Sequence, residues 1–351
     1  MKTSLEHEAG SQYDRTRPPY IERVATINSY FQTRDRDLIQ TRARLDTPIP
    51  LHQSGHRRLE ATVIATREGP VRVLGPSAWN TMVRLGQLPE PRTQMLVADE
   101  CWDTVGGTSA GKAVHLHDLG VPVVLMTPLA DDDAAAHIRG SLPDVAVEAL
   151  PTAATEHHIN LMSAAGKRVS VYTVAPATTP VPPVAGLADA RAVVLDLAPW
   201  TRELALTLRR GDLPVWTDLH DVPPESDWHE PFWRAATVVQ CSDDNLPDPF
   251  PFLHRLVDDG VSLAICTRGA AGAVAVDAGH QEHRQDAEEC AVVDTNGAGD
   301  AFFSGVMAAV LAGEATPDAL AAGARQATRA LVTRHIGPGI RDGRTGGVPT
   351  T

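Results

Sequence analysis

Residues 294–300 near the carboxyl end of the chain, Asp-Thr-Asn-Gly-Ala-Gly-Asp, run directly into Ala301-Phe302-Phe303 and decide the fold. Apolar residues then recur three and four positions apart from Phe303 to Leu311. This spacing predicts a buried helix that begins at the Gly-Ala-Gly turn. Because a helix amino end carries free N–H groups and glycines admit an anion close to the backbone, the turn predicts an anion site that contains Asp300.

Asp300 has two interpretations on these residues alone. A carboxylate beside a polyphosphate is unfavourable unless its charge is used, for example to accept the proton of a hydroxyl that attacks the γ-phosphate. That interpretation indicates phosphoryl transfer. In the other, Asp294 and Asp300 only cap the turn and its helix, as Asp often does, and an isolated Gly-Ala-Gly-Asp favours this second interpretation.

The composition of the chain restricts the class of protein. Its 351 residues are 43% hydrophobic and 21% charged, which is typical of a globular protein with one large or two modest domains. Because 44 acidic residues exceed 31 Lys and Arg, general nucleic-acid binding is disfavoured. No apolar stretch approaches the ~20 residues of a membrane span. The four cysteines form no CxxC pair, so neither a disulfide framework nor zinc is expected, and a reducing cytoplasm fits.

From Val71 onward, short β-branched runs alternate with helical patterns, which predicts an α/β fold with a mostly parallel sheet. The predicted strands are Val71–Leu74, Val121–Thr127, Ala192–Leu197, Pro214–Asp218, Thr237–Gln240, Ser262–Thr267 and Gly272–Val276. The predicted helices between them include Thr108–Leu119, Pro199–Leu208 and Phe250–Asp259.

The chain divides into three parts on the same evidence. Residues 1–70 lack the βα pattern and form an N-terminal extension of unknown role. One α/β domain is expected over residues 71–340, and residues 341–351 form a C-terminal tail. Alternating stretches within 88–105 and 148–174 predict half-exposed strands of a small flap outside the main sheet.

The stretch Asp-Thr-x-Gly-Ala-Gly-Asp-Ala-Phe closely resembles the C-terminal signature of the ribokinase family, also called PfkB carbohydrate kinases, with every fixed position present. Further motifs occur in the family's order over Val71–Gly339. Val71–Pro89, with Gly75 and Asn80, resembles the first strand and its substrate-binding turn, and Gly106-Gly107 resembles the glycine pair. Gly166-Lys167-Arg168 is similar to the lid turn, and Thr267–Gly272 to the segment that borders the nucleotide.

This resemblance implies a doubly wound, mostly parallel sheet flanked by helices, with a small β-lid. It implies a kinase that uses ATP and Mg²⁺ to phosphorylate a hydroxyl of a small sugar-like acceptor, and a homodimer formed through the lid. Asp300 takes the place of the catalytic base, with an anion hole made by the amides of Gly297, Ala298 and Gly299. The substrate positions are Asn80, Gly106, Gly107 and Gly111, and the nucleotide positions are Thr267, Gly269, Gly272, Asp294 and Thr295.

Three departures from the family pattern concern the substrate and the metal. Asn80 stands where many members have Asp, and Gly111 stands where the glycine-pair motif supplies Asn. Ser242–Asn245 replaces an Asn-x-x-Glu that organises metal-bound water, so Asp243 and Asp244 are the remaining metal candidates. Two alternatives therefore stay open: a nucleoside or specialised-metabolite kinase, and a non-catalytic ligand-binding or regulatory protein on the same fold.

Gly106–Lys112 also fits the start of a P-loop, G-x-x-x-x-G-K. A P-loop requires Ser or Thr next, where this chain has Ala113, and a hydrophobic strand directly before it, where this chain has Glu100–Asp103. Lys112 is therefore expected to be a helix residue that lies near the substrate pocket or points away from it. The acidic run Asp131–Asp133 is expected to cap the start of a helix.

Overall fold

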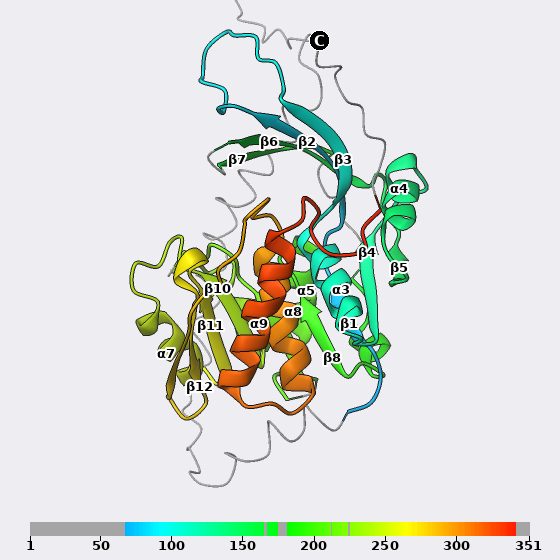
Figure 1. The fold of residues 1–351 in the computed structure, drawn as a ribbon. Coiled ribbons are helices and arrows are strands. Elements are labelled where there is room, and N and C mark those ends of the chain that lie inside the picture. Colours follow the sequence, from blue (N-terminus) through cyan, green and yellow to red (C-terminus); the bar gives the residue numbers. More distant parts are fainter. Residues whose placement is uncertain (1–66, 165–166, 175–180, 212, 224, 342–351) are drawn as a thin grey trace, which may run out of the picture. The chain divides into compact units, whose positions relative to one another are not determined.

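The large sheet of the protein has nine strands in the order β13-β12-β11-β10-β9-β8-β1-β4-β5. The computed structural model describes residues 67–164, 167–174, 181–211, 213–223 and 225–341, so residues 1–66, Gly166 of the lid turn and residues 342–351 lie outside the described residues. The strands are β1 (Val71–Leu74), β4 (Val123–Pro128), β5 (Ala146–Leu150), β8 (Ala192–Leu195), β9 (Val215–Asp218), β10 (Val238–Ser242), β11 (Leu263–Thr267), β12 (Ala273–Asp277) and β13 (Glu282–Gln285). All pairs are parallel except β11–β12 and β12–β13 at one edge, which confirms the predicted fold class (Figure 1).

Helices cover both faces of this sheet, because its central strands are apolar on both sides. Val73 and Val194 point into one core and their neighbours Leu74 and Leu195 into the other. The first core is covered by α3 (Thr108–Asp118), α4 (Asp133–Ser141), α8 (Ala298–Leu311) and α9 (Thr316–Leu331). The second core is covered by α5 (Pro199–Thr207), α6 (Glu230–Ala235) and α7 (Phe250–Asp258). Two short 3₁₀ turns, η2 (Val184–Leu187) and η3 (Gly269–Ala271), complete the connections.

A separate four-stranded sheet, called the small sheet below, has the order β3-β2-β6-β7 (Figure 1). Its strands are β2 (Ala78–Leu85), β3 (Glu100–Gly106), β6 (Glu156–Ser163) and β7 (Arg168–Val174). The chain enters it after β1 and again after β5. The sequence-based assignment of Asn80 to a turn was wrong, because residues 78–85 form β2. That strand pairs with both β3 and β6, and Ala78, Trp79, Asn80, Met82 and Leu85 are buried.

The order of the strands places a topological switch point next to β1. The chain proceeds from β1 to β4 on one side and later from β8 to β9 on the other. In open α/β sheets, ligands bind outside the carboxyl ends of the strands at such a point. Polar residues stand at or just after these ends here, namely Asp196 after β8, Asp218 at the end of β9, and Ser242 at the end of β10.

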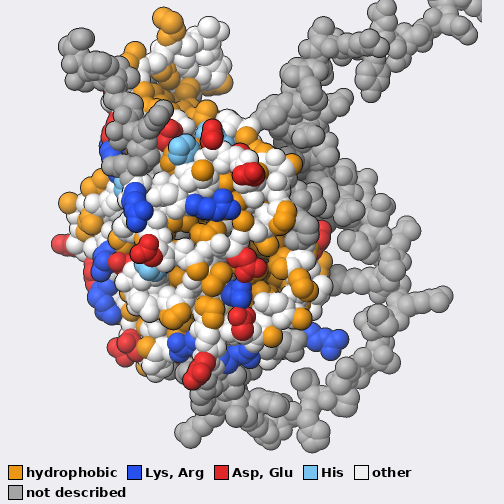
Figure 2. Space-filling view, turned by 90° about the vertical axis from the view of Figure 1, so that its right-hand side faces the viewer, with side chains coloured by type: hydrophobic (Ala, Val, Ile, Leu, Met, Phe, Trp, Pro, Cys, Tyr) orange, Lys and Arg blue, Asp and Glu red, His pale blue; other side chains and the backbone are white. Residues whose placement is uncertain are grey.

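The surface carries mixed charge. On the face shown in Figure 2, acidic and basic side chains are interspersed among apolar and uncharged atoms rather than gathered in a basic stripe. Within the part of the chain that the structure describes, no helix has both the length and the apolar character that a membrane crossing requires.

Asp132 is the N-cap of α4 and also ties that helix to the loop before β6. Its carboxylate accepts hydrogen bonds from the amides of Ala135 and Thr155, each at 2.9 Å. Burial acts to raise the pKa of Asp132, but these hydrogen bonds outweigh it and hold the pKa below the ordinary 3.8. The expectation that the acidic run caps a helix is met at this residue.

We expect Asp132→Ala to lower the free energy of unfolding by about 1 kcal/mol at neutral pH, because two amides lose their acceptor. A carboxylate whose pKa is lowered by folding stabilises the folded state when the pH is above its ordinary pKa. This stabilisation is lost as the pH falls through the pKa that the group has in the folded state. The difference in the free energy of unfolding between Asp132→Ala and wild type therefore becomes smaller in acid. Urea denaturation at neutral and acidic pH measures it, with exposed Asp131→Ala as the control. Equal effects of the two substitutions contradict the assignment.

Candidate active site

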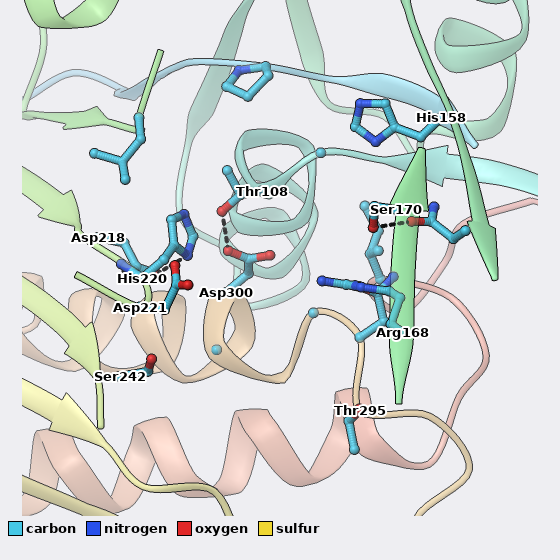
Figure 3. Close-up of a pocket in the computed structure, with 18 of the residues that line it drawn as sticks. Thr108, His158, Arg168, Ser170, Asp218, His220, Asp221, Ser242, Thr295 and Asp300 are labelled. Carbon is cyan, nitrogen blue, oxygen red and sulfur yellow. Dashed lines mark hydrogen bonds and ion pairs between the residues drawn. The ribbon is translucent and has the colours of Figure 1, made fainter. Parts of the chain in front are cut away.

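A cavity of about 780 Å³ lies between the carboxyl ends of the large sheet and one face of the small sheet. From the large sheet it is lined by Asp218, Gln240, Cys241, Ser242 and Thr267, and from the small sheet by Glu156, His158, Asn160, Met162, Arg168, Ser170 and Tyr172. Gly297, Gly299 and Asp300 line it at the start of α8. Figure 3 shows Asp300 between Asp218 and His220 on one side and Arg168 and Ser170 on the other.

α8 begins at the Gly-Ala-Gly turn, as the sequence predicts. Asp294 is buried and accepts a hydrogen bond from the amide of Asn296 at 2.9 Å, which tightens the turn. Gly297 is the N-cap of α8, with φ of 80°, a left-handed conformation that other residues adopt only with strain. Ala298 and Gly299 then begin the helix. The amino end of α8 therefore opens onto the cavity, as an anion site requires.

Asp300 is held by two donors from α3. The hydroxyl of Thr108 donates to Oδ1 at 2.5 Å, and the ammonium of Lys112 donates to the same oxygen at 2.7 Å (Figure 3 shows the first bond). Gly111, on the same helix, lies against the carboxylate, since a Cβ built there would be 3.0 Å from Oδ2. Asp300 is thus fixed on one side while the residue still lines the cavity.

Lys112 is the centre of a buried charge cluster. Its side chain has no solvent exposure, and its Nζ lies 2.9 Å from Oδ1 of Asp196 and 3.4 Å from Oδ2 of Asp218. β3 leads directly into α3, as a strand leads into a P-loop, although β3 belongs to the small sheet and includes Glu100 and Asp103 rather than being a hydrophobic strand. Even so, Lys112 does not line the cavity and contacts carboxylates, which is unlike the lysine of a P-loop.

The pKa values in this cluster follow from burial and charge. Burial acts to lower the pKa of Lys112, but attraction to Asp196, Asp300 and Asp218 outweighs it, so the pKa is raised and the amine stays charged. Burial raises the pKa of Asp196 in spite of Lys112. Burial acts to raise the pKa of Asp218, but attraction to His220 and Lys112 outweighs it, so the pKa is lowered.

Arg168 joins the small sheet to the turn before α8. Its Nη1 donates to Oδ1 of Asn296 at 2.6 Å, and Arg168 also lines the cavity. Nearby on the same face, Ser170 donates to Oδ1 of Asn160 at 2.6 Å. The ring of Tyr172 lies 3.9 Å from that of His158, centroid to centroid. A cation and several hydrogen-bonding groups therefore face the start of α8 across the cavity.

The predicted substrate residues are spread over two places. Gly107 lines the cavity, whereas Gly106 and Asn80 lie within the small sheet and Gly111 lies behind Asp300. Asn80 is in register with His158 on the neighbouring strand, and its Oδ1 is buried without a hydrogen-bond partner among the described residues. Asn80 therefore shares a sheet face with residues that line the cavity but does not line it itself.

Of the predicted nucleotide residues, Thr267, Asp294 and Thr295 line the cavity. Gly269 begins η3, shortly after β11, and Gly272 directly follows η3. The two metal candidates differ. Asp243 pairs with Arg268 at 3.4 Å, while Asp244 lines the cavity and accepts a hydrogen bond from Ser242 at 2.7 Å. Among the described residues, no group of three or more His, Cys, Asp or Glu side chains is arranged to hold a metal ion.

Sequence reasoning did not assign several residues of the site. His220 lines the cavity with φ of 52°, a conformation that is uncommon outside glycine, and its amide donates to Asp218. His158, Asn160 and Ser170 were placed only within a predicted flap. The alternation of the flap strands was a usable signal for them, but it did not show which face is turned to the large sheet.

Known proteins resemble this chain along most of its described length. An acarbose 7(IV)-phosphotransferase from an Actinoplanes species is 32% identical over 269 residues, covering 72% of this chain and 89% of that protein. The structure of the microbiome-derived acarbose kinase Mak1 matches with a TM-score of 0.66 at 24% identity, covering 76% of this chain and 93% of that one. Arabidopsis thaliana ribokinase, solved with ribose and ATP, matches with a TM-score of 0.64 at 18% identity, covering 78% and 96%.

A sequence model for pfkB family carbohydrate kinases matches residues 242–340, the part that runs from the last residue of β10 past α9 and includes the turn before α8. The predicted activity class, a phosphotransferase with an alcohol group as acceptor, agrees with these comparisons. The chain therefore belongs to the pfkB (ribokinase) family of carbohydrate kinases.

Proposed function

We propose that the protein is an ATP-dependent kinase that transfers the γ-phosphate to a hydroxyl of a sugar or a sugar-like specialised metabolite, with Asp300 as the general base. The observation that carries this proposal is the position of Asp300, which lines the cavity at the amino end of α8 and faces the polar side of the small sheet. A base and an anion site for phosphate then lie next to each other.

In the proposed step, the acceptor hydroxyl attacks the γ-phosphorus of ATP while its proton passes to the Asp300 carboxylate. The bond between the γ-phosphorus and the bridging oxygen breaks, and ADP leaves with the electron pair. The amides of Gly297, Ala298 and Gly299 stabilise the negative charge of the transferred group. Arg168, which reaches from β7 to Asn296 in the same turn, adds a positive charge at the cavity.

The nucleotide is proposed to bind along the carboxyl ends of β10 and β11, bordered by Thr267, Gly269 and Gly272, with Asp294 and Thr295 beside the phosphates. Mg²⁺ usually binds through one or two carboxylates plus substrate phosphates and water. Asp244 fits that pattern because it lines the cavity, whereas Asp243 is engaged by Arg268. When bound, the ion neutralises charge on the phosphates.

The acceptor is proposed to bind between Asp300 and the small sheet, near the glycine pair Gly106-Gly107. His158, Asn160 and Ser170 provide the donors and acceptors that a polyhydroxylated ligand requires. The relative from Actinoplanes is an acarbose phosphotransferase, so acarbose is the first acceptor to test. A nucleoside acceptor and a non-catalytic role remain outcomes of the same test.

The test is ADP release with ATP and Mg²⁺ over acarbose, monosaccharides, sugar phosphates and nucleosides. We expect release that depends on one acceptor class, with acarbose or a sugar giving the highest kcat/KM. Nucleoside-dependent release would change the substrate class, and ATP binding without release on any acceptor would favour the regulatory alternative.

Two further parts of the proposal concern the assembly and its location. A homodimer through the small sheet is supported by β7, an edge strand on which Val169 and Val171 are 45% and 44% exposed. Analytical ultracentrifugation measures the mass of the protein in solution, and the mass of two chains supports the homodimer.

A cytoplasmic location is supported by the use of ATP and by Cys101, Cys241, Cys266 and Cys290, which are all free thiols.

A further inference from the structure

We propose that Lys112 is a positioning residue for phosphoryl transfer: with Thr108 it holds one carboxylate oxygen of Asp300, so that the other oxygen meets the acceptor hydroxyl. The inference rests on the proposed role of Asp300 as the base. It concerns a residue that sequence reasoning placed only near the pocket or pointing away from it.

The hydrogen bonds of the Asp300 carboxylate are one-sided. Thr108 and Lys112 both donate to Oδ1, at 2.5 and 2.7 Å, and Thr108 itself accepts from Lys112 at 2.5 Å. Among the described residues, no hydrogen bond is made to Oδ2. Two donors on one oxygen fix the rotation of the carboxylate about its Cβ–Cγ bond. The second oxygen therefore keeps a constant position from which it can take a proton.

Gly111 is part of the same arrangement. A Cβ at this position would lie 3.0 Å from Oδ2 and 3.3 Å from Cβ of Asp300. At these distances the Asp300 carboxylate would have to shift from the position in which Lys112 holds it. Because Gly111 has no side chain, the Asp300 carboxylate has room for the position in which Lys112 binds it. This gives Gly111 a role different from the direct acceptor contact that the family resemblance implied.

Lys112 is anchored independently of any substrate. Asp196 and Asp218 hold the ammonium from the sheet side, at 2.9 and 3.4 Å, and the ring of Phe303 lies 5.1 Å from it. Both carboxylates are buried, and Lys112 is absent from the cavity wall. A lysine that binds phosphate directly has to reach the ligand, so the geometry favours an action through Asp300 instead.

The test compares Asp196→Asn with the double variant Asp196→Asn/Lys112→Met. Removing Lys112 alone takes their shared cation from three neighbouring carboxylates, whereas the double variant removes one charge of each sign. Asn at 196 still accepts the hydrogen bond of Ser109. We expect kcat of the double variant to be about 100-fold below that of Asp196→Asn, with KM for ATP unchanged, because a misplaced base slows the chemical step without weakening nucleotide binding.

The pH profile adds a measurement that a merely structural lysine would not change. The charged and titratable groups that face Lys112 are Asp196 after β8, Asp218 and His220 at β9, and Asp300 on α8. Without the ammonium, proton uptake by Asp218 and Asp300 is opposed less strongly than in Asp196→Asn. The acid limb of the kcat profile therefore moves to higher pH in the double variant than in Asp196→Asn.

Gly111→Ala tests the same idea without changing a charge. Its matched control is Gly140→Ala in α4, where a Cβ meets no atom within 4 Å. We expect several-fold lower kcat in Gly111→Ala, whereas Gly140→Ala keeps the wild-type kcat.

The double variant overturns the inference if its kcat and acid limb equal those of Asp196→Asn. If the double variant does not fold, Gly111→Ala decides, and an unchanged kcat overturns the inference. Full activity of Asp300→Asn is a different result, because it removes the proposed base itself and with it the proposed mechanism.

Discussion

Asp300→Asn reduces ADP release by about 10²- to 10⁴-fold at saturating acceptor, because an amide cannot take the proton of the attacking hydroxyl. The amide has nearly the shape of the carboxylate, and its oxygen can still accept from Thr108 and Lys112. Folding and ATP binding are therefore retained. Steady-state kinetics with the best acceptor of the panel measures the first effect, and calorimetric titration with ATP measures the second.

The chain offers a matched control for this substitution. Asp318 stands in the first turn of α9, as Asp300 does in the first turn of α8, but Asp318 is exposed and does not line the cavity. Asp318→Asn tests for the loss of a favourable helix-end charge alone. If both variants keep the wild-type rate, Asp300 is a cap and the proposed base is wrong.

Lys112→Met lowers the free energy of unfolding at neutral pH by about 3–5 kcal/mol, the range for removing one partner of a buried ion pair. Lys112 is fully buried, and so is Asp196, while Asp218 is nearly so. Removal of the ammonium leaves these carboxylates without their nearest cation. Urea denaturation measures the loss, with Lys167→Met as the control because Lys167 is exposed.

The free energy of unfolding of Lys112→Met depends on pH in a way that tests the ion-pair explanation. Burial already raises the pKa of Asp196 above the ordinary 3.8, and loss of the attraction of Lys112 raises it further. Between the ordinary and the raised pKa, the folded variant binds more protons than the unfolded chain, so its stability increases as the pH falls. The free energy of unfolding of Lys112→Met is therefore closer to that of wild type in mild acid than at neutral pH. A deficit that is equal at neutral and mildly acidic pH contradicts the ion-pair explanation.

The fold and the position of Asp300 in the first turn of α8 could be predicted from the sequence because their signals are local. The alternation of apolar runs with helical patterns from Val71 indicates a parallel sheet, and glycines next to a helical apolar pattern indicate where α8 begins. Asp300 follows from the same turn. A strand start was harder to recognise where turn-like residues precede it, and β2, which contains Asn80, was missed for that reason.

The surroundings of Asp300 could not be predicted, because they depend on contacts between distant parts of the chain. The partners of Lys112 are Asp196, Asp218 and Asp300, which follow β8, end β9 and begin α8. No spacing rule within α3 points to them. The sequence of α3 alone does not show that Lys112 is buried, because the carboxylates that pair with it come from other elements. The topology of the sheet brings those elements together.

The small sheet also has a consequence for the order in which the chain is made. β2 and β3 are synthesised early, but β6, the parallel neighbour of β2, follows only after β4, α4 and β5. Until β6 leaves the ribosome, one edge of β2 has no native partner, and an open edge is a site where chains associate wrongly. The wall of the cavity that faces Asp300 is thus complete only after the middle of the chain has been translated, and until then the open edge of β2 can pair wrongly.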